Sequence, residues 1–195
     1  MSESAKASSN KIIVITAPSG AGKTSITRYL LNKYPQLAFS VSATTRPPRP
    51  HEKNGVDYYF LSLDDFQQKI QHNEFAEWEM VYEGKYYGTL KSELKRILQA
   101  GKTPLLDIEV KGAIHIQEQF WGSSLSLFIE PPSVDELRRR LETRGTETAE
   151  SLMARVNKAA YELSFKQHFD IIILNDELEK ACRQADEAVK TFLGL

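Results

Sequence analysis

The chain has 195 residues, and its 25 lysines and arginines nearly balance its 26 aspartates and glutamates, for a formal net charge of −1. This length fits one domain that buries its own core, and the balanced charge excludes a basic field for bulk nucleic-acid binding. The single cysteine, Cys182, excludes an intrachain disulfide scaffold and suits a buried core position. No apolar run approaches the ~20 residues that cross a membrane, and no secretory signal opens the chain. We therefore expect a cytoplasmic protein with no membrane and no nucleic-acid partner.

The start of the chain predicts an α/β unit behind a polar tail. The first ten residues, MSESAKASSN, are small and polar, so we expect residues 1–10 to be disordered. From Lys11 the run KIIVIT is apolar and β-branched, which is typical of a buried parallel strand. Small residues follow it, and a helical pattern extends from Lys23 to about Lys33. A strand, a small-residue turn and a helix are the opening of an α/β unit.

The turn itself carries a phosphate-binding motif. Residues 17–24, APSGAGKT, match the P-loop pattern G-x-x-x-x-G-K-[ST] except at the first position, where alanine replaces glycine. In such a loop the backbone N–H groups surround a phosphate, and the following helix directs its N-terminus at the anion. We expect Lys23 to neutralise the β- and γ-phosphate oxygens and the Thr24 hydroxyl to bind Mg²⁺. The predicted ATP-binding residues are Ala17, Pro18, Ser19, Gly20, Ala21, Gly22, Lys23, Thr24 and Ser25.

Residues 37–89 have a different character. Short strand-like pieces, FSVSATT, DYYFL and AEWEMVY, accompany a proline- and charge-rich stretch, RPPRPHEKNG, and one helix is predicted over residues 63–72. Nine tyrosine, phenylalanine and tryptophan side chains are concentrated between residues 58 and 87. We expect an inserted antiparallel subdomain over 37–89, which leaves 11–36 and 90–195 for the core of the domain.

The alternation of helices and strands then resumes. Strands are predicted for TPLLDIE, SLSLFIE and FDIIILN, and helices lie between them and at the end of the chain. Ser133 is placed to cap the helix that follows the second of these strands. The polar segment RGTETAES has the composition of a mobile lid, which we place at about residues 140–155. The whole predicts a three-layer fold of the P-loop NTPase type, with about five strands in a central parallel sheet.

Further motifs resemble the guanylate kinase family. They are SVSATTRPPRPHEKNGVDYYF at 40–60, NEFAEW at 73–78, YYGT at 86–89, LDIE at 106–109 and RGTE at 144–147. With the P-loop, this resemblance extends from about Lys11 to Phe192. It implies a transferase that moves the γ-phosphate of ATP to GMP or dGMP with the help of Mg²⁺, in purine nucleotide metabolism.

The residue chemistry agrees with guanine as the base. Guanine presents O6 as an acceptor and N1–H and N2–H₂ as donors, so Glu77 can accept from both donors and Ser42 or Thr89 can donate to O6. Adenine has the opposite pattern at position 6, and a site built on hydrogen bonds rejects such a mismatch strongly. The resemblance adds phosphate-binding roles and a nucleoside contact, and the predicted GMP-binding residues are Ser42, Arg46, Arg49, Tyr58, Glu77, Tyr87, Thr89 and Glu109.

The resemblance also implies the catalytic set. Three arginines near the lid are expected to converge on the transferred phosphoryl group, and the predicted catalytic residues are Lys23, Arg46, Arg140, Arg144 and Arg155. Asp107 is expected to organise the water shell of Mg²⁺ beside Thr24. The family more often has aspartate where Glu109 stands and glutamine where Lys111 stands, and Lys111 has no functional explanation from the sequence. Asn175 and Asp176 are expected to border the adenine.

Three alternatives stay open at this point. A P-loop hydrolase would cleave a nucleotide without an acceptor, and the inserted guanine motif argues against it. A scaffold module of the same fold would bind peptides without catalysis, whereas Lys23, Thr24 and the lid arginines are all in place here. A kinase for another nucleoside monophosphate differs in the acceptor base. The sequence leaves open whether the protein is a monomer or a homo-oligomer.

Overall fold

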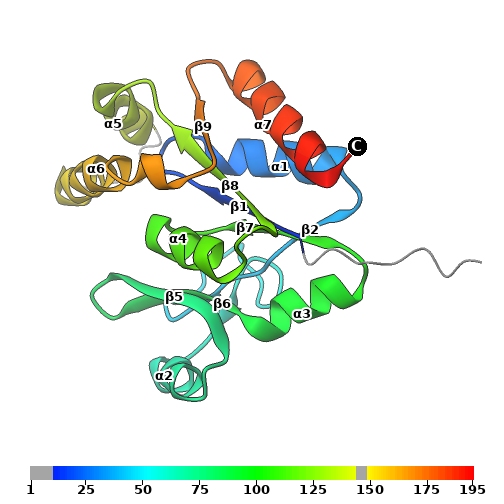
Figure 1. The fold of residues 1–195 in the computed structure, drawn as a ribbon. Coiled ribbons are helices and arrows are strands. Elements are labelled where there is room, and N and C mark those ends of the chain that lie inside the picture. Colours follow the sequence, from blue (N-terminus) through cyan, green and yellow to red (C-terminus); the bar gives the residue numbers. More distant parts are fainter. Residues whose placement is uncertain (1–10, 144–148) are drawn as a thin grey trace, which may run out of the picture.

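The computed structural model describes residues 11–143 and 149–195, which form an α/β fold around a five-stranded parallel sheet (Figure 1). The strand order is β2-β7-β1-β8-β9, and every neighbouring pair is parallel. The strands are β1 (Ile12–Thr16), β2 (Leu37–Phe39), β7 (Thr103–Asp107), β8 (Ser124–Glu130) and β9 (Ile171–Leu174). The predicted central parallel sheet of about five strands is therefore confirmed.

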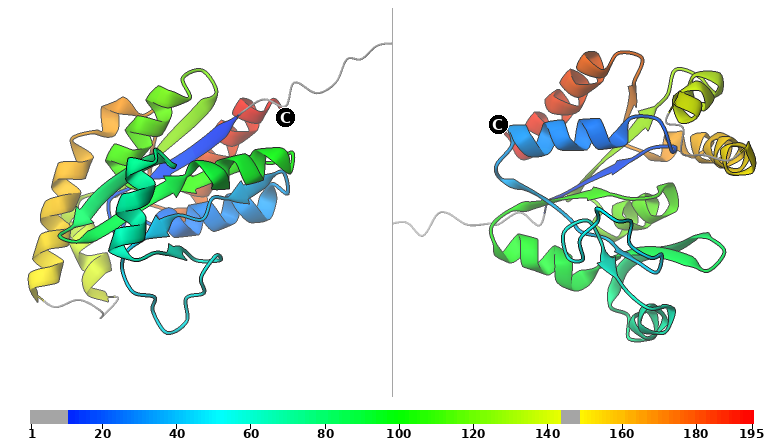
Figure 2. Two further views of the ribbon diagram at one scale, coloured as in Figure 1. Left: turned by 90° about the horizontal axis from the view of Figure 1, so that it is seen from below. Right: turned by 180° about the vertical axis from the view of Figure 1, so that it is seen from behind.

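Helices cover both faces of this sheet, which gives the predicted three layers. One face carries α1 (Lys23–Lys33) and α7 (Leu178–Leu193), which lie side by side in the view from behind (Figure 2). The other face carries α3 (Lys91–Gln99) and α4 (Val110–Gln119). None of the helices in the described ranges is long and apolar enough to cross a membrane.

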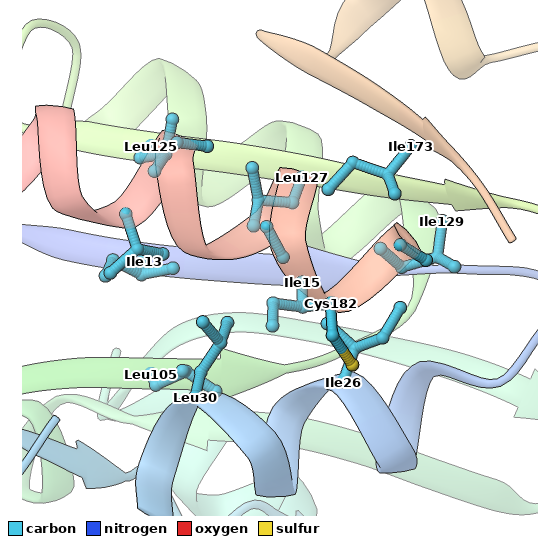
Figure 3. Packing of buried hydrophobic residues seen from close by; sticks show 14 of the residues in the cluster. Ile13, Ile15, Ile26, Leu30, Leu105, Leu125, Leu127, Ile129, Ile173 and Cys182 are labelled. Carbon is cyan, nitrogen blue, oxygen red and sulfur yellow. The ribbon is translucent and has the colours of Figure 1, made fainter. Parts of the chain in front are cut away.

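Strand β1 is buried along its whole length because helices cover it on both sides. Ile13 and Ile15 point toward α1 and α7, where they pack with Ile26 and Leu30 (Figure 3). Ile12 and Val14, which alternate with these two residues along β1, belong to the buried cluster beneath α4. Cys182 of α7 is one of the buried residues of the first cluster, as its sequence context predicts.

A second, four-stranded sheet lies beyond α4, with strand order β4-β3-β6-β5. Its strands are β3 (Ala43–Thr44), β4 (Tyr59–Phe60), β5 (Phe75–Tyr82) and β6 (Lys85–Leu90). The helix α2 (Leu63–Gln71) packs on it through Phe66, whose ring stacks on Phe75 at 4.3 Å between centroids.

Two details differ from the sequence expectation for this region. β3 and β4 pair in parallel, so the second sheet is mixed rather than purely antiparallel. β2 pairs with β7 in the central sheet, so the expected boundary at residue 37 assigns a core strand to the insert. Both errors have one cause, because short strand-like pieces in a sequence do not reveal which strand they pair with.

The last two α-helices before β9 stand beyond the carboxyl ends of the central strands, on the same side as the β5–β6 hairpin (Figure 1). They are α5 (Val134–Thr143) and α6 (Ala149–Leu163), and they pack together through Leu137, Leu141 and Ala159. Ser133 caps α5 as predicted, because its Oγ accepts a hydrogen bond of 3.0 Å from the Glu136 N–H.

Candidate active site

A cavity of about 600 Å³ opens where the carboxyl ends of the central strands face the second sheet and α6. Ligands of open α/β sheets bind at this edge. The predicted site residues on its wall are Ala17, Pro18, Ser19, Gly20, Gly22, Lys23, Thr24, Ser25, Ser42, Arg49, Tyr58, Glu77, Tyr87, Asp107, Glu109 and Arg155. Residues that are far apart in sequence thus meet in one cavity.

The other predicted residues lie beside the wall or outside the described ranges. Ala21 of the P-loop is fully buried, and so is Thr89, which contacts Glu77. Arg46 makes an ion pair with Glu52 in the insert, and Arg140 makes one with Glu136 of α5. Arg144 belongs to residues 144–148, which lie outside the described part of the chain.

The P-loop takes its shape from two glycines in the left-handed region. Gly20 and Gly22 have φ of 97° and 96°, a conformation that glycine adopts without a steric penalty. Among residues 11–143 and 149–195 the one non-glycine residue at positive φ is Asn73, so Ala17 replaces the usual first glycine without strain. Asn175 braces this loop from below, since its Nδ2 donates a 2.6 Å hydrogen bond to the Ala21 carbonyl. Its amide therefore faces the loop backbone.

Lys23 begins α1 and reaches across to the end of β7. Its Nζ lies 2.6 Å from Asp107 Oδ1 and donates a 3.2 Å hydrogen bond to the Ile108 carbonyl. Burial opposes protonation of Lys23, but the carboxylates of Asp107 and Glu109 outweigh it and raise the lysine pKa. The charged ammonium group of Lys23 is therefore held beside Asp107, the carboxylate that we expect to organise the water shell of Mg²⁺.

At the far end of the cavity the insert brings together arginine, tyrosine and one carboxylate. Arg46 makes a two-pronged ion pair with Glu52, with N–O distances of 2.6 and 2.7 Å, and its guanidinium lies 4.7 Å from the centroid of the Tyr58 ring. Glu52 also accepts from the Arg49 backbone N–H at 2.8 Å. The hydrogen bonds from Arg46 lower the pKa of Glu52 to about 2. Tyr87 packs edge-on against Tyr58.

Glu52 is a site residue that sequence reasoning missed. The available signal was its position, since it is the one carboxylate in the predicted phosphate-binding stretch RPPRPHEKNG. A carboxylate there looks like a charge that would repel a phosphate. The structure shows that it instead fixes the guanidinium of Arg46 in place.

Glu77 lies on the wall of the cavity with only 6% of its surface exposed. Its cross-strand neighbour Thr89 donates a 2.6 Å hydrogen bond from Oγ1 to Glu77 Oε1. Burial raises the pKa of Glu77 to about 7. An irregularity in β5 follows Phe75, and three successive residues are buried there, so burial does not alternate along this part of the strand.

Helix α4 leaves room for this carboxylate at a glycine. A Cβ at Gly112 would collide with Oε2 and Cδ of Glu77. Gly112 is helical and has an ordinary φ, so this glycine serves the close approach of Glu77 rather than a special backbone conformation. Lys111, beside it, places its Nζ over the Tyr161 ring at 5.5 Å, which gives that residue a packing role.

Glu109 forms the start of α4 and pairs with a lysine of α6. Lys158 Nζ lies 2.6 Å from Glu109 Oε2 and 3.1 Å from Oε1 of the buried Glu162. Burial opposes ionisation of Glu109, but Lys23 and Lys158 lower its pKa, whereas burial raises the pKa of Glu162. Sequence reasoning missed both residues of α6, although their spacing from Arg155 is helical.

The lid arginines occupy different surroundings. Arg155 lies on the cavity wall, and its Nη1 donates a 3.1 Å hydrogen bond to Ser19 Oγ of the P-loop. Arg140 instead binds Glu136 and the Asn175 carbonyl. Arg138 and Arg139 pair with glutamates on the exposed face of α5.

Comparison with known proteins identifies the family. The family model described as guanylate kinase matches residues 9–192. A guanylate kinase of Bacteroides fragilis is 51% identical over 185 residues, which is 95% of this chain and 91% of that protein. One of Porphyromonas gingivalis is 46% identical and covers 94% of this chain and 98% of its own.

The fold leads to the same family. The crystal structure of guanylate kinase from Anaplasma phagocytophilum superposes with a TM-score of 0.76 at 30% identity, over 94% of this chain and 86% of that one. Family, relatives and fold agree over nearly the whole sequence. The chain therefore belongs to the guanylate kinase family, whose members transfer a phosphoryl group from ATP to GMP.

Proposed function

We propose that phosphoryl transfer from ATP to GMP or dGMP takes place in the cavity between the P-loop and the second sheet. The observation that carries this proposal is that one cavity joins Lys23 of the P-loop with the buried carboxylate Glu77. A P-loop alone fits any nucleotide hydrolase, whereas a buried acceptor group opposite it fits a second nucleotide. The cytoplasmic location and the role in purine nucleotide metabolism stay predictions.

ATP binds with its phosphates in the P-loop. Residues 17–25 surround the phosphates, and Lys23 moves from Asp107 to the β- and γ-phosphate oxygens. Thr24 and Asp107 stand on the same wall and offer oxygen ligands, the type that Mg²⁺ prefers, with Asp107 acting through water. When bound with ATP, Mg²⁺ supplies positive charge that neutralises the phosphate oxygens.

GMP binds on the side of the second sheet. Glu77 accepts hydrogen bonds from guanine N1–H and N2–H₂, and Ser42 provides a hydroxyl for O6. Thr89 acts through Glu77, because its hydroxyl donates to that carboxylate. Glu109 contacts the nucleoside. The GMP phosphate binds Arg49, Tyr58, Tyr87 and Arg46, the last of which Glu52 holds in position.

The reaction needs position and charge rather than a strong base. A phosphate oxygen of GMP is already an anion, and it attacks the γ-phosphorus of ATP directly. The bond from that phosphorus to the β–γ bridging oxygen breaks, and ADP leaves with the electron pair. Lys23, Arg46 and Arg155, together with Arg140 and Arg144, neutralise the charge on the transferred group.

A coupled assay of ADP formation from ATP tests this proposal. GMP and dGMP are compared with AMP, UMP and dTMP, and one reaction contains no acceptor. We expect ADP to form rapidly with GMP alone among the ribonucleotides. ADP released equally without an acceptor would instead indicate a hydrolase, and no ADP under any condition would favour a binding module.

A further inference from the structure

Helix α6 carries a row of three polar side chains, of which Arg155 and Lys158 lie on the wall of the cavity. Arg155, Lys158 and Glu162 follow each other at spacings of three and four residues, so they share one face of the helix. Arg155 contacts the P-loop through Ser19, and Lys158 contacts Glu109 at the junction of β7 and α4. One helix therefore contacts the ATP side and the GMP side of the cavity at once.

Lys158 contacts Glu109 and two further side chains. Its ammonium group donates at 2.6 Å to Glu109 Oε2 and lies 5.5 Å from the centroid of the Tyr82 ring on β5. Oε1 of Glu162 lies 3.1 Å from the same ammonium group, and only 5% of that glutamate side chain is exposed. Lys158 is thus confined between three elements, and its own side chain is 22% exposed.

Glu109 remains available to a ligand despite this pairing. Its side chain is 34% exposed and lies on the cavity wall, whereas Glu162 is not on that wall. A glutamate at this position has an additional rotatable bond compared with aspartate, so without a partner its carboxylate would sample several positions. A lysine that binds one oxygen removes this freedom before the nucleoside arrives.

We propose that Lys158 is a positioning residue for GMP, which orients Glu109 toward the nucleoside and is itself oriented by Glu162. This inference rests on the proposed function, because it takes Glu109 as a nucleoside contact. Lys158 does not touch the reacting phosphates, so its loss affects the binding of GMP more than the chemical step. Its effect also depends on Glu109, through which it acts.

The experiment compares four enzymes: the wild type, Lys158→Met, Glu109→Gln and the double variant. Methionine keeps the length and apolar stem of lysine but has no ammonium group. We expect Lys158→Met to raise the KM for GMP roughly tenfold, the scale for a lost hydrogen bond to a charged group, with kcat changed less than about twofold. In the Glu109→Gln background the same substitution should change the KM for GMP by less than about twofold.

Lys166→Met is the matched control. Lys166 follows α6, makes an ion pair of 2.6 Å with Glu130 and does not belong to the cavity wall. Its substitution should leave the KM for GMP unchanged. If Lys158→Met does not fold by circular dichroism, Lys158→Gln and Lys158→Arg replace it, and arginine should restore most of the GMP affinity that glutamine loses.

Two results would overturn the inference. One is an unchanged KM for GMP in Lys158→Met, and the other is an effect of the same size with and without the Glu109 carboxylate. Both require a wild-type enzyme that forms ADP in a GMP-dependent way, so they differ from a failure of the proposed function, in which the wild type itself shows no GMP-dependent ADP formation.

Discussion

In the proposed function, Glu77 is the residue that accepts from the N1–H and N2–H₂ donors of guanine. It is nearly fully buried, it lies on the cavity wall, and its Oε1 accepts from Thr89. In Glu77→Gln one acceptor becomes a donor and the charge is lost. We expect GMP to bind more weakly by about 1.5–3 kcal/mol, the range for a hydrogen bond to a charged group, while ATP affinity stays the same. Isothermal titration with each nucleotide measures both quantities.

A control for this prediction is Glu74→Gln. Glu74 lies just before β5 and pairs with Lys69 at the surface, so its loss should leave GMP binding unchanged. Equal GMP affinity in Glu77→Gln and in the wild type would remove Glu77 as the guanine-reading residue.

The same residue makes stability depend on pH. Burial raises the pKa of Glu77 to about 7, above the 4.5 of an unperturbed glutamate, so its carboxyl group favours the folded state below pH 4.5 and loses this contribution as pH rises through 7. Glu77→Gln cannot ionise. Relative to wild type it should therefore gain stability between pH 5 and 8, by at most about 3 kcal/mol. Urea unfolding across this range tests the prediction, and a pH-independent difference between the two proteins would contradict it.

On the ATP side of the cavity, the residue with the largest expected effect on catalysis is Lys23 of the P-loop. Its ammonium group is held beside Asp107 at the start of α1, where a γ-phosphate would replace the carboxylate. Lys23→Ala should reduce kcat by about a hundredfold or more, because a preorganised charge contributes about 3 kcal/mol to the transition state. Steady-state kinetics at saturating ATP and GMP measure this, and a near-normal kcat would contradict the P-loop assignment.

Among the structural elements, the P-loop depends most on backbone conformation. Gly22 has a φ of 96°, and a Cβ there would also collide with Asn175 Nδ2. We expect Gly22→Ala to destabilise the fold by more than the ~1–2 kcal/mol of a left-handed alanine and to raise the KM for ATP. Gly122→Ala is the control, because Gly122 has a φ of 76° but a Cβ there would meet open space. Equal thermal shifts in the two variants would show that the contact with Asn175 has no importance.

Elements were predictable from sequence where their signal is local. The P-loop, the helix start at Ser133 and the buried strand β1 each follow from a few neighbouring residues. The pairing of β2 with β7 joins residues about 66 positions apart, for example Leu37 with Thr103, and no local pattern encodes it. The parallel pairing of β3 with β4 was missed for the same reason.

Across the whole molecule, some residues of the candidate site could be predicted from local motifs, and others could not. Residue types at motif positions indicated Lys23, Glu77 and Arg155, and the structure brings all three to one cavity. The partners that hold other site residues were not indicated: Glu52 pairs with Arg46 from six residues further along the same loop, and Lys158 of α6 pairs with Glu109 across 49 residues of sequence. Such partners are ordinary surface charges in a sequence, and only the fold distinguishes them.

The two nucleotide sites should also be coupled across the molecule through α6. This helix contacts the P-loop through Arg155 and the GMP side through Lys158, so a ligand that orders α6 from one side lowers the cost of ordering it for the other. We expect a non-hydrolysable ATP analogue to raise GMP affinity about fivefold or more, within the usual 1–3 kcal/mol of coupling. Linkage requires GMP to raise the affinity of the analogue by the same factor, so isothermal titration in both orders provides an internal check.

Lys158→Met should reduce this coupling factor toward one, while Lys166→Met should leave it unchanged. Independent binding of the two ligands in the wild type would show that α6 contacts both sites without linking them.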